Sequence, residues 1–309
     1  MPMKEGVQLR GFCRRSFLGR MAAAAATSSL ALAQPPKSAR ANASAQKGLR
    51  LSAAWNMVMG NTPVGDGLAM LTKLGYEAFE LFDWRDPATL ESFAREKKKY
   101  PLECACLTAN KNPVAPGCSL VNPRERDDFV EQVKLAVEAV NKLDSKGLLV
   151  LSGNEMEGIS RAEQLNNAVY ALRAAVPILE KNNVTAFVEV VNNVEFPGYF
   201  LYNMRYAAAL IDRVNSPNVK ILCDLYHLQM MEGNLINNIR SNIDRIGHFH
   251  VGDIPGHHEP GTGEINYRNV FKAIYELGDH FQGSVGLEYR PLAPLEENLT
   301  AMRKLANFG

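Results

Sequence analysis

Eight short apolar runs that alternate with amphipathic helical patterns restrict the fold of this 309-residue chain more than any other feature. The apolar runs lie at residues 49–55, 77–82, 102–108, 147–151, 184–191, 219–224, 246–251 and 284–289. The helical patterns lie at residues 66–74, 88–99, 124–143, 162–181, 202–214, within 235–245, 267–277 and 296–306. Such alternation is typical of parallel strands joined by helical crossovers. Eight units over roughly 260 residues predict an α/β fold, a (β/α)8 TIM barrel.

An open, doubly wound sheet is the alternative arrangement of the same elements. That fold commonly carries a glycine-rich GxGxxG turn after its first strand, and no such turn follows residues 49–55. Residues 46–309 also contain no linker rich in proline, glycine or serine. We therefore predict one catalytic barrel domain that spans residues 46–309.

Residues 1–45 have the pattern of an export signal instead of a folded segment. Arg14 and Arg15 precede Ser-Phe-Leu, and an alanine-rich apolar run follows at residues 21–33. This run is too short and too weakly apolar to span a bilayer. The order resembles a twin-arginine signal, with small residues that suit cleavage after Ala33 or Ala43. We predict a signal peptide and linker at residues 1–45 and an exported, periplasmic mature protein. The alternative is a disordered basic tail in which two arginines are adjacent by chance.

Composition and charge exclude some classes of partner. The chain is 46% hydrophobic and 22% charged, which is ordinary for a soluble globular protein, and its formal net charge is +1. Without a dense basic face, nucleic acid and an anionic membrane are not expected partners of the mature form. We expect a small-molecule substrate, and a homo-oligomer is compatible with the sequence. Among the five cysteines, Cys104 and Cys106 are expected to be small core residues.

Polar residues end most of the predicted strands, and the carboxyl ends of the strands form the site in a parallel barrel. These strand-end residues are Glu80, Asp83, Asn110, Glu189, Asp224, His250 and Glu288. A buried carboxylate is costly unless it is paired or bound to a cation, so Glu189, Asp224 and Glu288 need a common partner. Together with His250 they predict a site for Mg²⁺ or Mn²⁺ that leaves positions for neighbouring substrate oxygens.

Four segments carry the pattern of a known family. EVVNNVEFPGYFL begins at Glu189, CDLYHLQMMEGNL at Cys223, IGHFHVGDIPGHHEPGTGEINY at Ile246 and VGLEYRP at Val285. Together they resemble the hydroxypyruvate isomerase family, within the xylose isomerase-like TIM barrels, whereas the first four strands match more loosely. The resemblance implies a metal-assisted aldose-ketose isomerisation of a small hydroxycarbonyl compound, of the hydroxypyruvate to tartronate semialdehyde type.

The resemblance also implies roles for single residues. The two catalytic glutamates fall on Glu189 and Glu288, and the metal ligands fall on Glu189, Asp224, His250 and Glu288. The histidine of the DxYH motif falls on His227, which implies contact with substrate oxygens. In this chemistry a carboxylate carries a proton between adjacent carbons of an enediol, and a cation stabilises the enediolate oxygens.

The loop after residue 251 departs from the family pattern. Many members have an arginine in a PGRHEP loop, whereas this chain reads PGHHEP and has His257 there. Histidine is a weaker and pH-dependent partner for a carboxylate, so a substrate-binding His257 weakens the case for hydroxypyruvate itself. We also expect Glu195 and Trp84 to contact substrate. The alternative for Glu195 is a solvated loop charge, and the alternative for Trp84 is a position in the core. His248 is expected to be a structural histidine that points toward the helices, away from His250.

Three other functions compete with this interpretation. A ketose 3-epimerase would use the same glutamates and metal but would abstract a different proton. A non-catalytic sugar-binding barrel would have no turnover to lose when the glutamates are changed. An endonuclease-like barrel would need several metals and a basic groove, which the near-neutral charge disfavours.

Overall fold

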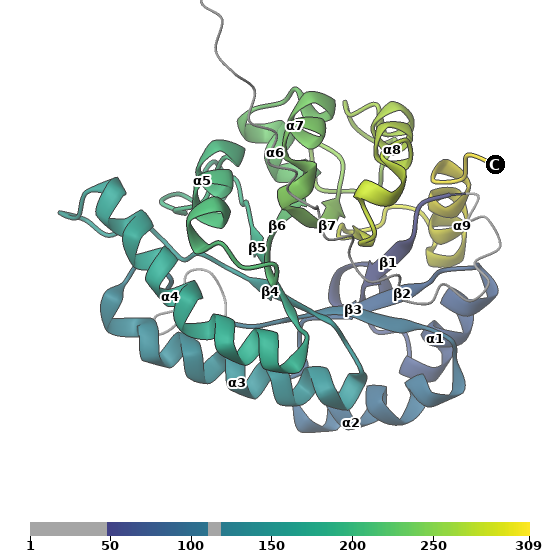
Figure 1. Cartoon of the computed structure of the whole chain (residues 1–309). Helices are drawn as coiled ribbons and strands as arrows, with labels where there is room; N and C mark the ends of the chain where they lie inside the picture. Colours follow the sequence, from purple (N-terminus) through teal and green to yellow (C-terminus); the bar gives the residue numbers. More distant parts are fainter. Residues whose placement is uncertain (1–47, 111–118) are drawn as a thin grey trace, which may run out of the picture. The chain divides into compact units, whose positions relative to one another are not determined.

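A closed barrel of eight parallel strands forms the centre of the part of the chain that the structure describes, residues 48–110 and 119–309. In this computed structural model, whose strands β1 to β7 are labelled in Figure 1, each strand pairs with the next along the chain. The ring closes because β1 also pairs with β8. The strands are β1 (Leu51–Ala54), β2 (Ala78–Leu81), β3 (Glu103–Thr108), β4 (Gly147–Val150), β5 (Thr185–Glu189), β6 (Val219–Asp224), β7 (Ile246–Val251) and β8 (Val285–Leu287). The predicted (β/α)8 barrel is confirmed. The twin-arginine signal predicted within residues 1–45 lies outside the described residues.

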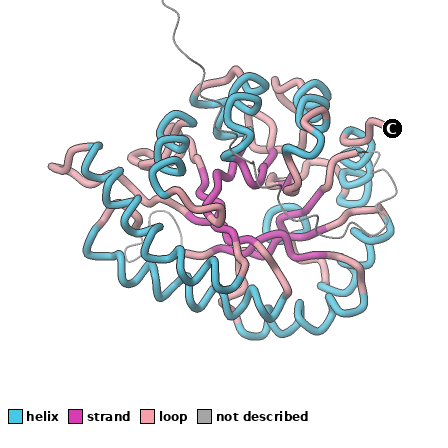
Figure 2. Tube along the Cα trace, in the orientation of Figure 1, coloured by secondary structure: helices cyan, strands magenta, loops and turns pink. Residues whose placement is uncertain are grey.

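Helices surround the strands on the outside of the ring (Figure 2). They are α1 (Val64–Lys73), α2 (Pro87–Glu96), α3 (Arg126–Leu143), α4 (Arg161–Asn182), α5 (Met204–Val214), α6 (Leu225–Met231), α7 (Leu235–Asn242), α8 (Tyr267–Tyr275) and α9 (Leu295–Leu305). Within the described ranges, no helix combines the length and the apolar character needed to cross a bilayer.

Two short helical segments directly after strands are not predicted by the sequence patterns. A π-helix, η1 (Trp55–Met59), continues from β1, and α6 continues from β6. Both are too short for a helical period to be recognised. The start of α6 has a clear local cause, because Oδ1 of Asp224 accepts the backbone N–H groups of Tyr226 and His227 at 2.7 and 3.1 Å. This cap places His227 beside the end of β6.

Side chains on β2 alternate between the helix layer and the interior of the barrel. Phe79 faces outward, where its ring stacks on Phe93 of α2 with centroids 5.3 Å apart and meets the edge of Trp55 at 6.4 Å. The next residue, Glu80, is fully buried and contacts side chains from other strands of the ring. One strand therefore contributes both to the apolar layer and to the polar centre.

The same alternation on β7 corrects the expected orientation of His248. Phe249 packs against Phe281 with ring centroids 4.8 Å apart, whereas Nε2 of His248 and Nε2 of His250 lie 3.0 and 2.9 Å from the carboxylate of Glu80. The expectation that His248 points toward the helices is wrong, because residues two positions apart on a strand share a face. Both histidines lie inside the barrel.

The packing of Phe79 generates a stability prediction. We expect Phe79→Ala to lower the free energy of unfolding by about 3–5 kcal/mol, because it removes a buried ring that two other rings contact. Urea unfolding followed by circular dichroism measures this loss. The matched control is Leu135→Ala on α3, whose side chain is 48% exposed and whose loss should change stability by less than about 0.5 kcal/mol. Equal effects of the two substitutions would contradict the prediction.

Candidate active site

Four side chains from consecutive strands meet at the carboxyl end of the barrel. Glu189 ends β5, Asp224 ends β6, His250 lies near the end of β7 and Glu288 directly follows β8. Each offers one ligand atom, and these atoms all lie within 4.8 Å of one another. Asp224 and His250 are register partners on neighbouring strands. The structure thus brings together the four predicted metal ligands, which include both predicted catalytic residues. We call this group the acid–imidazole cluster.

The imidazole of His250 links the acid–imidazole cluster to a further buried carboxylate. Its Nδ1 lies 2.7 Å from Oε2 of Glu288 and 3.7 Å from Oε1 of Glu189. Its Nε2 lies 2.9 Å from Oε2 of Glu80. Burial by itself would lower the pKa of His250, but the charges of Glu288 and Glu80 outweigh it and raise the pKa well above its usual value.

The two predicted catalytic glutamates differ in their electrostatic surroundings. Burial raises the pKa of Glu189 to about 8, and the charges of Glu288 and Asp224 act in the same direction, against the lowering effect of His250. Burial also acts to raise the pKa of Glu288, but the neighbouring His250 opposes it, and this pKa is lowered overall. A divalent cation at this position would compete with protons for these groups.

Two buried atoms of the cluster lack hydrogen-bond partners within the described part of the chain. They are Oδ2 of Asp224 and Nδ1 of His250, the latter close to Glu288 without the alignment of a hydrogen bond. A buried polar atom that stays unpaired costs about 1–3 kcal/mol. Carboxylate oxygens are the preferred ligands of Mg²⁺ and Mn²⁺, and an imidazole is compatible with such a set. The donor atoms therefore fit a divalent cation.

A cavity of about 550 Å³ adjoins the cluster. Its lining residues are Met57, Phe82, Thr108, Leu149, Leu151, Glu189, Val191, Glu195, Phe196, His227, Gly256, His257, Glu288 and Arg290. The volume is within the usual range for sites that bind small molecules. Both predicted catalytic glutamates face this space together with histidines and an arginine, so its chemistry suits a small molecule that carries oxygen groups.

His227 and Glu195, two of the predicted substrate-binding residues, are held by one network. The side-chain Oδ1 of Asn192 accepts the backbone N–H groups of the two residues Val194 and Glu195. This orients the side-chain Nδ2 of Asn192 toward Nδ1 of His227 at 2.7 Å. His227 therefore accepts at Nδ1 and carries its proton on Nε2, which lies 3.9 Å from Oδ2 of Asp224. Asn192 also donates to Glu195 at 3.1 Å, and the Tyr226 hydroxyl donates to Glu195 at 2.6 Å.

His257, a third predicted substrate-binding residue, forms part of the cavity wall in a left-handed backbone conformation with φ of 56°. Its ring stacks on Tyr226, with centroids 4.0 Å apart and planes 8° apart. Gly252 leaves room for this ring, because a β-carbon there would lie 2.3 Å from the imidazole. The Nε2 atom of His257 is buried without a hydrogen-bond partner among the described residues. The position agrees with substrate contact, which stays a prediction.

Trp84 is the predicted substrate-binding residue that the structure places elsewhere. Its indole N–H donates to the backbone carbonyl of Thr108 at 2.8 Å, and the guanidinium of Arg85 lies 4.4 Å from its ring centroid. It lines a separate depression with residues of α2 and α3, among them Leu90 and Gln132. This position agrees with the alternative of a packed, largely buried tryptophan.

Two further buried acids lie near the site, Glu80 and Asp253. Glu80 is one of the strand-end residues recognised in the sequence, without a predicted role of its own, whereas Asp253 was not recognised. Asp253 comes two residues after β7 and organises the loop that follows. Its carboxylate accepts backbone N–H groups from Ile254, Gly261 and Ile265 at 2.9, 2.8 and 3.1 Å. Asp253 could have been recognised in the sequence as an acidic residue just beyond an apolar strand. Glu80 is an acidic residue within the apolar run of β2.

The barrel and the cluster at its strand ends agree with the family comparison. The chain belongs to the xylose isomerase-like TIM barrel family, whose model matches residues 68–305. Among solved structures, AP endonuclease, family 2, from Brucella melitensis superposes with a TM-score of 0.71 at 26% identity, covering 84% of this chain and 100% of that one.

Similar proteins with assigned activities indicate which branch of the barrel family the chain belongs to. Hydroxypyruvate isomerase of Escherichia coli K12 is 38% identical over 180 residues, which is 58% of this chain and 69% of the relative. The 2-oxo-tetronate isomerase of Cupriavidus necator is 31% identical over 175 residues, 55% of this chain and 65% of the relative. Within the wider barrel family, the chain belongs to the hydroxypyruvate isomerase family, and it is an isomerase.

The unpaired atoms of the cluster generate a prediction about metal removal. We expect Mn²⁺ at about 100 times its Kd to stabilise the EDTA-treated protein by about 2.7 kcal/mol, because the ion binds the folded state only. Asp224→Asn should lose this gain, since it removes a charged ligand while an asparagine still caps α6. Thermal unfolding with EDTA and with Mn²⁺ measures both effects. A full Mn²⁺ response in Asp224→Asn would contradict the assignment.

Proposed function

We propose that this chain interconverts hydroxypyruvate and tartronate semialdehyde, or a closely related small hydroxycarbonyl acid. The observation that carries the proposal is the convergence of Glu189 and Glu288 on one cavity, within a cluster whose donor atoms suit a divalent cation. The names of the relatives, hydroxypyruvate isomerase and 2-oxo-tetronate isomerase, support a substrate with adjacent hydroxyl and carbonyl groups and a carboxylate.

Proton transfer between neighbouring carbons is the work we assign to the two glutamates. One glutamate removes a proton from the hydroxymethyl carbon beside the carbonyl group, which forms an enediolate. A proton returns to the former carbonyl carbon, and the hydroxyl proton moves to the oxygen on that carbon, so the composition is unchanged. Glu189 ends β5 and Glu288 follows β8, and both line the cavity in which the substrate would lie.

The remaining cavity residues would bind and orient the substrate. The acid–imidazole cluster would hold a divalent cation, which would stabilise negative charge on the enediolate oxygens. The Nε2–H group of His227 would donate to a substrate oxygen, because its Nδ1 is already occupied by Asn192. Arg290 lines the same cavity and supplies a permanent positive charge for a carboxylate, which His257 does not.

Two rival functions, a ketose 3-epimerase and a nuclease, differ from the proposed isomerase in what they require. A ketose 3-epimerase would use the same cluster, so only the carbon that exchanges its proton distinguishes it. A nuclease, as the name of the Brucella melitensis relative indicates for that protein, would need a phosphate-binding basic face. The formal net charge of +1 does not favour such a face.

Replacement of the catalytic carboxylates tests the proposed mechanism. Glu189→Gln and Glu288→Gln should each lower kcat by about 10²–10⁴-fold, because an amide of the same size can no longer exchange a proton. The matched control is Glu264→Gln, an exposed residue of the loop after β7, which should retain activity. Turnover of hydroxypyruvate followed by product analysis is the measurement. Near-normal activity in either site variant would refute the assignment.

Isotope exchange identifies the substrate and the reaction together. The purified protein would be incubated in D₂O with hydroxypyruvate and a panel of small aldoses and ketoses. In hydroxypyruvate, deuterium at C3, the hydroxymethyl carbon, or at C2 of the product indicates isomerisation. In a ketose, deuterium at C1, or at C2 of the aldose formed from it, indicates isomerisation, whereas deuterium at C3 indicates epimerisation. Sugar binding without deuterium uptake in any compound would favour the non-catalytic barrel.

We also propose that the protein is exported to the periplasm through the twin-arginine pathway. The proposal is supported by Arg14 and Arg15, the Ser-Phe-Leu segment after them and the apolar run at residues 21–33. This pathway carries folded proteins, so the barrel would be able to acquire its cation before export.

Substitution of the arginine pair tests the export proposal. In a bacterial host with this pathway, the double variant Arg14→Lys and Arg15→Lys should remain in the cytoplasmic fraction, because the paired guanidinium groups define the signal. Arg10→Lys, which changes an arginine outside the pair, is the control and should be exported. Immunoblots of periplasmic and cytoplasmic fractions provide the readout. Equal periplasmic recovery of the double variant would refute the proposal.

A further inference from the structure

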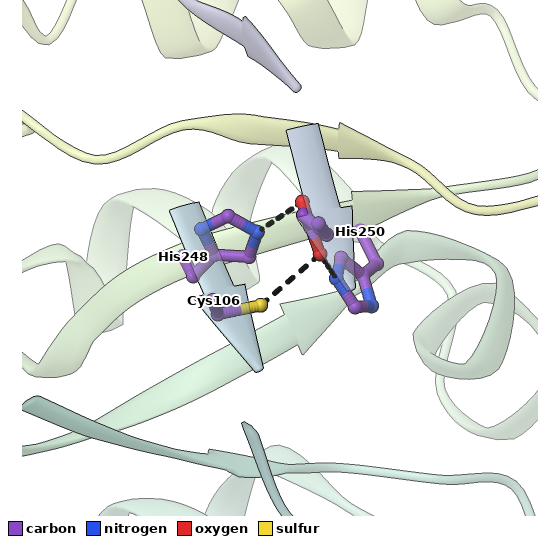
Figure 3. A group of neighbouring side chains, drawn as sticks. Cys106, His248 and His250 are labelled. Carbon is purple, nitrogen blue, oxygen red and sulfur yellow. Dashed lines mark hydrogen bonds and ion pairs between the residues drawn. The ribbon is translucent and has the colours of Figure 1, made fainter. Parts of the chain in front are cut away.

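Glu80 is a fully buried carboxylate at the centre of the barrel, below the acid–imidazole cluster. Four donors from three strands converge on it. Its Oε1 receives the Ser52 hydroxyl at 2.6 Å and Nε2 of His248 at 3.0 Å. Its Oε2 receives Sγ of Cys106 at 3.1 Å and Nε2 of His250 at 2.9 Å. Figure 3 labels His248, Cys106 and His250, and its dashed lines mark their contacts with the oxygens of Glu80.

The chemistry of a carboxylate decides where the proton of His250 lies. An ionised carboxylate only accepts hydrogen bonds, so Nε2 of His250 must carry a proton to stay 2.9 Å from Oε2 of Glu80. The other ring nitrogen, Nδ1, then faces Glu288 and Glu189 at 2.7 and 3.7 Å. In the neutral imidazole that would ligate a cation, the proton on Nε2 is kept and the lone pair is on Nδ1, the atom that points into the acid–imidazole cluster.

We propose that Glu80 is a positioning residue that holds the proton of His250 on Nε2 and so keeps Nδ1 available as the metal ligand. The proposal rests on the proposed function, because it requires the acid–imidazole cluster to bind a cation. Carboxylates that accept the second N–H of a ligating histidine fix both the tautomer and the orientation of its ring. Glu80 would act through His250 without touching the substrate, since it does not line the cavity.

Gly286 leaves the space that the contact between Glu80 and His250 requires. Gly286 on β8 lies beside it, and a β-carbon at that position would be 2.2 Å from Oε1 of Glu80 and 2.8 Å from the ring of His250. Any larger residue at 286 would displace one of the two groups. The absence of a side chain there lets Glu80 and the His250 ring approach each other across the barrel.

The same four groups, Glu80, Cys106, His248 and His250, are also of the types that bind zinc. The distances favour a hydrogen-bonded cluster instead. Each oxygen of Glu80 already has two donors within 3.1 Å, which leaves no acceptor position for a cation. Ligation would also require loss of the protons on two histidines and on the thiol. A second bound metal is therefore an outcome that would overturn the proposal.

Metal affinity of variants provides the first test. Glu80→Met keeps the length of the side chain but removes the acceptor, so the Kd for Mn²⁺ should rise about 10–100-fold. Ser52→Ala is the matched control, because it removes a donor to the other oxygen of Glu80 and leaves the His250 contact in place. Its Kd should stay within about threefold of wild type. Binding is measured by calorimetric titration, with circular dichroism to verify folding.

A direct measurement of the tautomer keeps the proposal testable if Glu80→Met does not fold. In the Mg²⁺-loaded wild-type protein, long-range ¹H–¹⁵N correlation spectra should show His250 protonated at Nε2 and unprotonated at Nδ1. A proton on Nδ1, an unchanged Mn²⁺ Kd in folded Glu80→Met, or two metal ions per chain would each overturn the role of Glu80. No metal binding by the wild type would overturn the metal part of the proposed function as well, so the two failures are distinguishable.

Discussion

The burial of one negative charge inside the barrel is the constraint on which the site depends. Glu80 has no solvent contact, and an unpaired carboxylate in such a place would cost several kcal/mol. Burial acts to raise the pKa of Glu80, but the two neighbouring histidines outweigh it and lower this pKa well below the usual value. The two oxygens accept from four donors, as an ionised carboxylate can. The contact with Glu80 holds the imidazole of His250 in position. The other nitrogen of that imidazole lies beside the carboxylates at the rim of the barrel.

A second set of constraints shapes the cavity above the cluster. Asp253 gathers three backbone N–H groups and folds the loop after β7, while Gly252 leaves the space into which the ring of His257 packs. Tyr226 stacks on that ring and donates to Glu195. The wall that would meet the substrate is therefore built by contacts of α6 with the loops after β5 and β7, and it combines imidazole groups with acidic ones.

The acid–imidazole cluster was predictable because its members share a simple signal. Each of Glu189, Asp224, His250 and Glu288 lies at the end of an apolar run, and the carboxyl ends of parallel strands meet at one rim of a barrel. Trp84 shows the limit of that reasoning. It also follows a strand, yet its indole N–H turns to the carbonyl of Thr108, a choice that depends on packing between neighbouring strand ends.

The sequence by itself determined the order of the strands and of the longer helices, the barrel class and the residues that end the strands, because these depend on local periodicity and composition. Only the tertiary structure decided which groups meet. Glu80 and His250 are 170 positions apart, and their contact requires the ring to close. The register shift between β6 and β7 and the left-handed turn at His257 are likewise set by closure and loop packing, which no short stretch of sequence encodes.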